Sequence, residues 1–286
     1  MADLEETVTS LYRLTSWPVS CRHDLLASYP AFKLGEREST VYYARRLAPV
    51  VEALIAAQPQ TTAWALTAPP CHAIPAAANL LCREIFRLLK GGFGSPARLS
   101  LIEIAEDVQQ LEQHRANVDY SRLSSTERIE ARERSASAIV HHQALSGQTV
   151  IFVNDINVTG AQQRVMRHYF EAIGVAVIHW IYIIEVADEL GRQAPQIEYD
   201  LNTWKYGSFD DFAAFLSTAE ITFTSKCIAR IFSYDMVELS RLFSMLSLRS
   251  RLRILELTIQ EERYGGDAFS EKIDLLRTFC NRARQP

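Results

Sequence analysis

The sequence has little of what builds metal centres, disulfide frameworks or membrane spans. Its five cysteines are scattered along 286 residues without a Cys-x-x-Cys pair or a Cys/His cluster, so neither disulfides nor a zinc site are expected. The longest apolar run, roughly 175–186, contains His179 and is too short to cross a bilayer. The acidic N-terminal residues lack the pattern of a signal peptide. These absences favour a soluble, cytoplasmic protein with reduced thiols.

An excess of positive charge is also absent. The 30 Lys and Arg residues face 34 Asp and Glu residues, which gives a formal net charge of -4. A protein that grips nucleic-acid backbone would be basic, so we expect no nucleic-acid partner. The Gly-x-Gly-x-x-Gly and P-loop motifs are missing too, which counts against the common nucleotide-binding motifs of doubly wound enzymes.

The first two thirds of the chain alternates short apolar runs with helical patterns. Helices are predicted from Pro75 to Lys90 and between Gly160 and Gly174, where apolar residues recur at helical spacing. The alternation predicts an α/β fold with a parallel, Rossmann-like sheet and helical crossovers. The predicted strands are 64–68, 99–105, 150–153 and 175–186, the last of which could hold two strands.

The alternation of strand and helix patterns ends near residue 195, and from 196 onward the sequence pattern is mainly helical. We therefore predict a sheet domain at 1–195 and a helical C-terminal extension at 196–286. One long amphipathic helix or two abutting ones are expected, with a buried apolar face. That face would pack on the sheet domain or on a second subunit, and we favour a homodimer because isologous dimers are the commonest oligomers. Its residues are Leu242, Leu246, Leu252, Leu255 and Ile259.

Small polar residues follow the apolar run Val150–Val153 at once. Asn154 and Asp155 come first, and a turn ending in Thr159-Gly160 precedes the next helix. In open parallel sheets, ligands bind beyond the carboxyl ends of the strands. A tight turn there is expected to aim successive backbone N–H groups outward, and these groups with the following helix N-terminus favour a phosphate. A carboxylate accepts hydrogen bonds from sugar hydroxyls. The segment predicts a receptor for a phosphorylated pentose; the alternative is an ordinary strand–turn–helix junction with polar caps.

The stretch VIFVNDINVTGAQ, residues 150–162, resembles the signature of type I phosphoribosyltransferases. The resemblance implies that Asn154 and Asp155 are catalytic and hold the ribose hydroxyls of phosphoribosyl pyrophosphate (PRPP). It departs from the signature because Asn154 replaces an acid and hydroxyl residues are missing near Val158 and Gln162. The residues implied to surround the 5-phosphate are Asn157, Val158, Thr159, Gly160, Ala161 and Gln162.

Two earlier segments extend the resemblance, which covers about residues 30–190. AFKLGERESTVYYARRLA (31–48) and LTAPPCHAIPAAANLL (66–81) look like segments of phosphoribosyltransferases from bacterial stress-response and tellurite-resistance gene clusters. The resemblance implies that the loop in 66–81 contacts pyrophosphate; the alternative is an ordinary Pro-rich turn. It also implies that Lys33 binds a phosphate; the alternative is a surface cation. The pyrophosphate candidates are Lys33, Thr67, Ala68, Pro69 and Pro70.

The charge-mixed stretch 106–135 is either a solvated helix or loop, or a mobile lid over the pyrophosphate. No histidine has a spacing that identifies it as a base, and His179, inside an apolar run, is expected to be a satisfied core residue. The lid candidates are Arg115, Tyr120, Arg122 and Arg128.

The resemblance implies a pentosyltransferase of nucleotide metabolism. It would transfer ribose 5-phosphate from PRPP to an unidentified base or other nitrogen nucleophile and release pyrophosphate. Mg²⁺ would be carried with PRPP and would have few direct protein ligands. The alternatives are a non-catalytic PRPP-binding sensor with the same fold and, third, another doubly wound nucleotide-binding enzyme.

Overall fold

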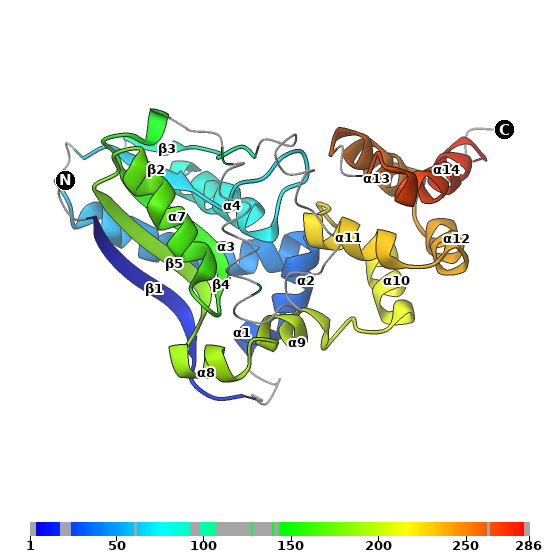
Figure 1. Ribbon diagram of the computed structural model, residues 1–286, viewed down its shortest axis with the longest axis horizontal. Helices are drawn as coiled ribbons and strands as arrows, with labels where there is room; N and C mark the ends of the chain where they lie inside the picture. Colours follow the sequence, from blue (N-terminus) through cyan, green and yellow to red (C-terminus); the bar gives the residue numbers. More distant parts are fainter. Residues whose placement is uncertain are drawn as a thin grey trace.

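Five parallel strands form one sheet in the order β1-β5-β4-β2-β3, which confirms the predicted α/β fold (Figure 1). The computed structural model describes residues 4–17, 24–59, 62–91, 98–106, 127, 139, 143–261 and 264–282. The run at 175–186 holds one strand and not two. The strands are β1 (Glu5–Leu14), β2 (Trp64–Thr67), β3 (Leu99–Leu101), β4 (Thr149–Asn157) and β5 (Val177–Val186).

Strand β1 was not predicted from the sequence. It lies at the edge of the sheet and pairs only with β5 among the described strands. Its sequence, EETVTSLYRL, lacks the continuous apolar run of the central strands, because most of its side chains are exposed or half-buried. Edge strands carry polar residues of this kind, so hydrophobicity alone does not reveal them.

Strand β4 runs further than the apolar residues predicted. It continues through Asp155 to Asn157 because β5 keeps pairing with it, up to the partners Asn157 and Glu185. On its other side, pairing with β2 ends earlier, at Thr67 and Phe152. Residues 153–157 therefore have a strand on one side and the loop after β2 on the other. Strand β3, in contrast, ends at Leu101 and not at Ala105.

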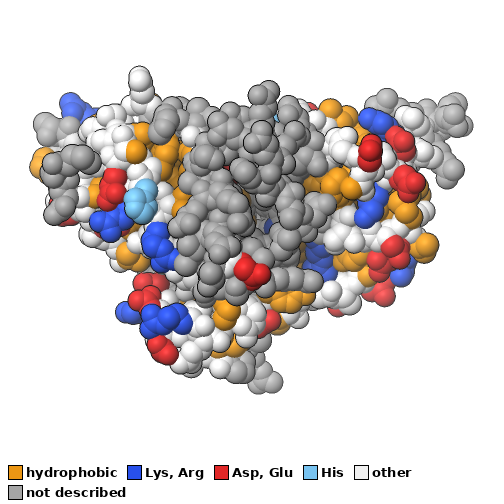
Figure 2. All heavy atoms as spheres, in the orientation of Figure 1, with side chains coloured by type: hydrophobic (Ala, Val, Ile, Leu, Met, Phe, Trp, Pro, Cys, Tyr) orange, Lys and Arg blue, Asp and Glu red, His pale blue; other side chains and the backbone are white. Residues whose placement is uncertain are grey.

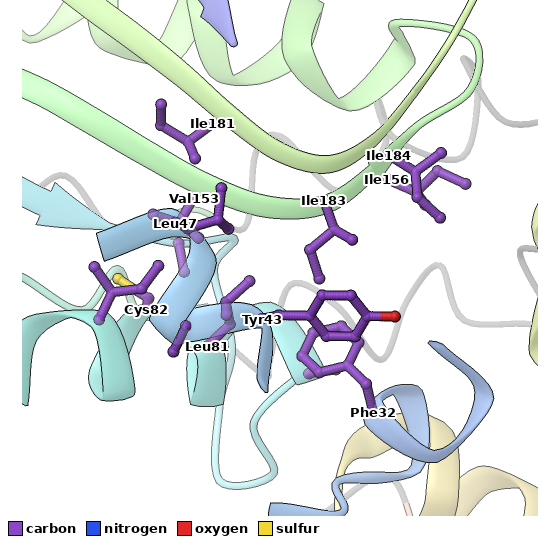
Figure 3. Close-up of a cluster of buried hydrophobic side chains, with 14 of the residues drawn as sticks. Phe32, Tyr43, Leu47, Leu81, Cys82, Val153, Ile156, Ile181, Ile183 and Ile184 are labelled. Carbon is purple, nitrogen blue, oxygen red and sulfur yellow. The ribbon is translucent and has the colours of Figure 1, made fainter. Parts of the chain in front are cut away.

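Helices cover both faces of the sheet. Helices α3 and α4 pack on one face through a cluster that includes Leu47, Leu81, Val153 and Ile183 (Figure 3). Helix α7 packs on the other face, where Phe170 meets Phe152 and Trp180. These helices and their neighbours are α1 (Asp24–Ala27), α2 (Tyr29–Leu34), α3 (Arg37–Ala56), α4 (Ala77–Gly91), η2 (Gln143–Leu145) and α7 (Ala161–Ala172).

The order of the strands creates a switch point between β2 and β4. From β2 the chain winds outward to β3, and from β4 it winds outward the other way to β5. Loops leaving the carboxyl ends of two such strands diverge and leave a crevice, the usual ligand site of open α/β sheets. The residues after β2 and those around Asp155 border this position.

The C-terminal part is helical, and its helices α10–α14 lie beyond α2 on the side away from β1 (Figure 1). They enclose a second hydrophobic cluster, which also takes in Ala31, Leu34 and Ile74 from the sheet-bearing part. The boundary at 195 stays a prediction. The helices are α8 (Asp188–Gln193), α9 (Ile197–Thr203), α10 (Phe209–Thr218), α11 (Ser225–Ser233), α12 (Met236–Met245), α13 (Leu248–Gln260) and α14 (Asp267–Arg282).

The predicted apolar face of this part is divided between two helices. Leu242 and Leu246 are buried, but Ile259 is 58% exposed, so its predicted burial was wrong. The helix breaks after α12, where the Ser247 hydroxyl accepts the Ser250 N–H and starts α13 afresh. The new helix buries Ile254 and Leu257 instead, because the break shifts the helical phase.

None of the described cysteines takes part in a disulfide. Burial raises the pKa of Cys71 to about 11 and shifts the pKa of Cys82 and of Cys227 upward as well. Among the residues that the structure describes, no helix is both long and apolar enough to cross a membrane.

His179 lies in the core, 6% exposed, as expected. Its Nδ1 lies 2.6 Å from the Thr7 hydroxyl and its ring stacks on Trp64, but Nε2 has no hydrogen-bond partner. The expectation that both ring nitrogens of His179 have hydrogen-bond partners is therefore only partly confirmed. Burial lowers the pKa of His179 below its usual 6.5, against a smaller upward effect of Glu5.

This lowered pKa predicts acid sensitivity. The unfolded chain takes up the His179 proton at a higher pH than the folded chain does, so stability should fall as pH drops below about 6.5, by at most about 1.4 kcal/mol per pH unit for one proton. Urea unfolding between pH 7 and pH 5 should show a shallower decline for His179→Gln than for the wild type. Equal slopes would contradict the prediction.

Candidate functional site

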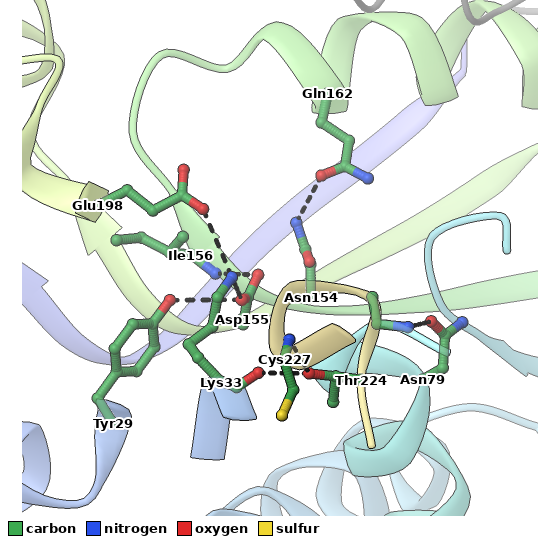
Figure 4. A network of polar contacts seen from close by, with 11 residues as sticks. Tyr29, Lys33, Asn79, Asn154, Asp155, Ile156, Gln162, Glu198, Thr224 and Cys227 are labelled. Atoms are coloured by element: carbon green, nitrogen blue, oxygen red, sulfur yellow. Dashed lines mark hydrogen bonds and ion pairs between the residues drawn. The ribbon is translucent and has the colours of Figure 1, made fainter. Parts of the chain in front are cut away.

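Asp155 is the centre of a buried polar network at the carboxyl end of β4 (Figure 4). Its Oδ2 accepts hydrogen bonds from the Lys33 ammonium and from the Tyr29 hydroxyl, the latter at 3.3 Å. Its Oδ1 accepts the Ile156 N–H at 2.9 Å. The structure therefore brings Lys33 to the predicted ribose-binding acid and not to the loop after β2.

Lys33 also pairs with a second carboxylate, that of Glu198 on α9, with 3.4 Å between Nζ and Oε1. The three charged side chains are only 10–13% exposed. Burial by itself lowers the pKa of Lys33, but Asp155 and then Glu198 raise it, and the net shift is upward. Burial, followed by the charge of Asp155, raises the pKa of Tyr29 well above 10, so the phenol stays a donor.

Asn154 belongs to the opposite face of β4, because successive side chains of a strand alternate. Its Nδ2 donates to Oε1 of Gln162 in the first turn of α7, at 3.0 Å (Figure 4). The two residues that the signature pairs as ribose ligands are thus held by different elements, Asp155 by α2 and Asn154 by α7.

The turn between β4 and α7 is fixed by its own side chains. Gly160 has a φ of 69°, which glycine adopts easily. Its N–H donates to Oδ1 of Asn157 at 2.9 Å, so this N–H faces into the turn and not outward as predicted. Asn157 in turn donates to Gln163 at 3.1 Å. Arg164 donates to the Thr159 carbonyl at 3.2 Å, which places a permanent positive charge beside the turn.

Gly191 of α8 packs directly against the backbone of this turn. A Cβ at position 191 would lie 2.0 Å from the carbonyl oxygen of Val158, so only glycine fits without a shift. Close packing of backbone on backbone therefore holds the turn from the side of α8.

Gly191→Ala should displace the Val158 carbonyl and lower the free energy of unfolding by about 1–3 kcal/mol, as overpacking does. The matched control is Gly91→Ala at the end of α4, where an added Cβ meets no atom within 4 Å. Urea denaturation of both variants measures the difference. Equal stability of the two variants would show that the Val158 carbonyl can move away from an added Cβ without a loss of stability.

The loop after β2 has its backbone groups committed to protein partners. Asn79 of α4 donates to the Pro69 carbonyl at 2.8 Å, and the Cys71 N–H donates to the Ile104 carbonyl at 3.2 Å. The Ala73 and Ile74 N–H groups donate to Glu261, at 3.1 and 2.9 Å. Because Pro69 and Pro70 carry no N–H, these residues supply fewer donors than a pyrophosphate loop would need. The pyrophosphate role of Thr67, Ala68, Pro69 and Pro70 stays a prediction.

The C-terminal part contacts the site on two sides, at the loop after β2 and at α2. The buried carboxylate of Glu261 holds the loop after β2, as described above. The Thr224 hydroxyl donates to the Lys33 carbonyl at 2.8 Å (Figure 4). Gly35, at the end of α2, has a φ of 93°, and a Cβ there would meet the Thr222 carbonyl oxygen at 1.9 Å. Helix α2, which carries Lys33 and Tyr29, is thereby locked onto the C-terminal part.

Several predicted residues lie outside the described part of the chain. Apart from residues 106 and 127, the charged stretch 106–135 falls there, so the predicted lid stays a prediction. The described residues hold no group of three or more His, Cys, Asp and Glu that could bind a metal ion. The predicted candidates outside the described residues are Arg115, Tyr120, Arg122 and Arg128.

Sequence reasoning missed four residues that the fold brings to this region: Tyr29, Arg164, Glu198 and Glu261. Arg164 carried a usable signal, since it follows the motif within the first turn of the next helix. The other three carried none. Lys33 and Glu198, for example, are 165 positions apart along the chain, and no local pattern connects them.

A family model described as PRTase ComF-like matches residues 6–276. This match takes in the C-terminal helices, whereas the sequence resemblance covered only about 30–190. No curated protein and no solved structure matches the chain. Since the matched model spans nearly the whole sequence and the fold agrees, the protein belongs to the PRTase ComF-like family of type I phosphoribosyltransferases, a family of glycosyltransferase-type transferases.

Proposed function

We propose that the protein binds PRPP at the carboxyl end of β4 and transfers its ribose 5-phosphate to a nitrogen nucleophile, with release of pyrophosphate. One observation carries the proposal: a buried carboxylate, Asp155, and a glycine turn leading into a helix lie together at the switch point of a parallel sheet. Such a position gives a hydroxyl acceptor beside an anion-binding helix start.

Each part of the site has a role in this reaction. Asp155 accepts hydrogen bonds from the ribose hydroxyls, and the turn at Asn157–Gly160 with the start of α7 receives the 5-phosphate. Arg164, beside the turn, adds positive charge to the phosphate end. The bond from the anomeric carbon to pyrophosphate breaks, pyrophosphate leaves with the electron pair, and the acceptor nitrogen bonds to the carbon and loses its proton. The developing positive charge of the sugar ring is stabilised by the carboxylate.

The residues present fit a Mg²⁺ ion carried by the substrate. Asp155 offers a carboxylate oxygen that already contacts one cation, the Lys33 ammonium. One carboxylate with substrate oxygens and water is an ordinary Mg²⁺ environment, and a larger protein cage is not needed. When bound, Mg²⁺ would neutralise pyrophosphate charge.

A PRPP sensor without catalysis is the second candidate. It is favoured by position 154, where an amide bonded to Gln162 stands in place of a carboxylate. Fewer negative charges at the sugar reduce the stabilisation of a cationic transition state more than they reduce binding. Binding and turnover therefore separate the two functions.

The test is a calorimetric titration of the full-length protein with PRPP and Mg²⁺, followed by an assay of pyrophosphate release with a panel of purine, pyrimidine and other nitrogen acceptors. Binding with acceptor-dependent release supports the transferase. Binding without release by any acceptor favours the sensor. No binding of PRPP, in a folded protein, would overturn both.

We propose no nucleic-acid partner. Figure 2 shows Lys and Arg side chains interspersed with Asp and Glu side chains over the C-terminal helices. Pairs such as Arg241 with Asp210 and Arg277 with Asp274 neutralise one another on this part. A phosphate backbone would need a continuous basic surface. The homodimer also stays a proposal, and analytical ultracentrifugation tests it.

A further inference from the structure

We propose that Glu198 is a positioning residue of the sugar site: it takes over the Lys33 ammonium when PRPP occupies Asp155. The inference rests on the proposed function. It concerns a residue of the helical C-terminal part, and it makes Lys33 a side chain with two alternative partners.

The starting point is competition for Asp155. In the structure its Oδ2 is engaged by Lys33 and Tyr29, and its Oδ1 by the Ile156 N–H. A carboxylate has about four acceptor sites, and three of them are taken, so both ribose hydroxyls can donate to Asp155 only if one of these donors leaves. The Ile156 N–H is fixed in the backbone next to the carboxylate itself, so a side chain must yield.

Lys33 is the donor that can yield at low cost. A buried ammonium without a partner is strongly destabilising, so it can leave Asp155 only if another acceptor is within reach. Glu198 supplies that acceptor at 3.4 Å, on the other side of the ammonium (Figure 4). The Tyr29 ring, whose centroid lies 5.9 Å from Nζ, adds a second favourable contact that does not depend on Asp155.

The backbone around the pair is held, so the movement is confined to the Lys33 side chain. Helix α2 is fixed by the hydrogen bond from Thr224 to the Lys33 carbonyl. Helix α9 is fixed by Ile197 and Leu201, which are 0% and 3% exposed in the core of the sheet domain. The backbone positions of Glu198 and Lys33 therefore stay fixed while the ammonium exchanges one carboxylate for the other.

The test is a double-mutant cycle on PRPP affinity, measured by calorimetry with Mg²⁺. Glu198→Gln keeps the shape but removes the charge, which leaves Lys33 dependent on Asp155, so PRPP must compete harder. Its Kd should rise by about tenfold. In a Lys33→Gln background the same change should have little effect, because no ammonium remains to be received. Glu189→Gln on α8, whose carboxylate is 69% exposed, is the matched control and should bind like the wild type.

The outcomes separate the possibilities. An equal loss with and without Lys33 would show that Glu198 touches the ligand itself, and would overturn the positioning role. Unchanged affinity in folded Glu198→Gln, with wild-type binding intact, would overturn this inference and leave the proposed function standing. No binding by the wild type would overturn both. If Lys33→Gln does not fold, Glu198→Asp decides: it keeps the charge and should retain most of the affinity, and a loss equal to that of Glu198→Gln would count against the proposal.

Discussion

Replacing Asp155 by alanine is expected to weaken PRPP binding by about 10- to 150-fold, because hydrogen bonds to a charged group contribute about 1.5–3 kcal/mol. Asp155 is 7% exposed and lies at the switch point of the sheet, so water cannot easily take the place of its carboxylate in the variant. Lys33 keeps Glu198 as a partner in the variant, which limits the structural damage. Calorimetry with PRPP and Mg²⁺ measures the loss.

The control is Asp210→Ala on α10, whose carboxylate is 72% exposed and pairs with Arg241. It removes the same group far from the sugar site and should bind PRPP like the wild type. Thermal unfolding establishes that both variants are folded. Wild-type affinity in a folded Asp155→Ala protein would show that the ribose hydroxyls bind elsewhere.

A chain truncated after residue 195 is expected to aggregate and to lose PRPP binding. The cut removes Ile197 and Leu201 from the core of the sheet domain. It also uncovers Ala31, Leu34 and Ile74, which the C-terminal helices bury. Several large apolar side chains would then face water, at about 25 cal/mol for each Å² exposed. Solubility, sedimentation and calorimetry on the purified chain check this.

A second cut, after residue 203, keeps α9 with Glu198 but still removes α10–α14. It too should aggregate, because the Thr224 bond to Lys33 and the Glu261 bonds to the loop after β2 are lost. If this longer chain is soluble and binds PRPP while the shorter one does not, α9 alone is essential. A soluble, fully binding chain that ends at 195 would refute the prediction outright.

The sequence was sufficient for the central strands because they are covered on both faces. Such strands must be continuously apolar, so the runs in β2, β4 and β5 stand out from their surroundings. The edge strand β1 did not stand out, since one of its edges and much of its surface face solvent. The extent of β4 was also missed, because its last four residues are specified by pairing with β5 and not by hydrophobicity.

The site was predicted to the extent that it is local. The order of acid, glycine and helix start can be read within 150–162, where a few consecutive residues fix their own geometry through the Asn157–Gly160 bond. The glycine of the turn and the helix after it were therefore predicted correctly. The outward direction of the Gly160 N–H was not, since the Asn157 side chain competes for it.

The sequence by itself determined the α/β class, the central strands and the position of the glycine turn after β4, because periodicity and turn chemistry act over a few residues. Only the tertiary structure decided which groups face Asp155. Lys33 lies 122 positions before it, and Glu198 reaches the same ammonium from a helix that pattern analysis assigned to a separate part. A buried charge selects its partners by proximity in the folded chain, and that proximity is set by how α2 and α9 pack, not by any spacing along the sequence.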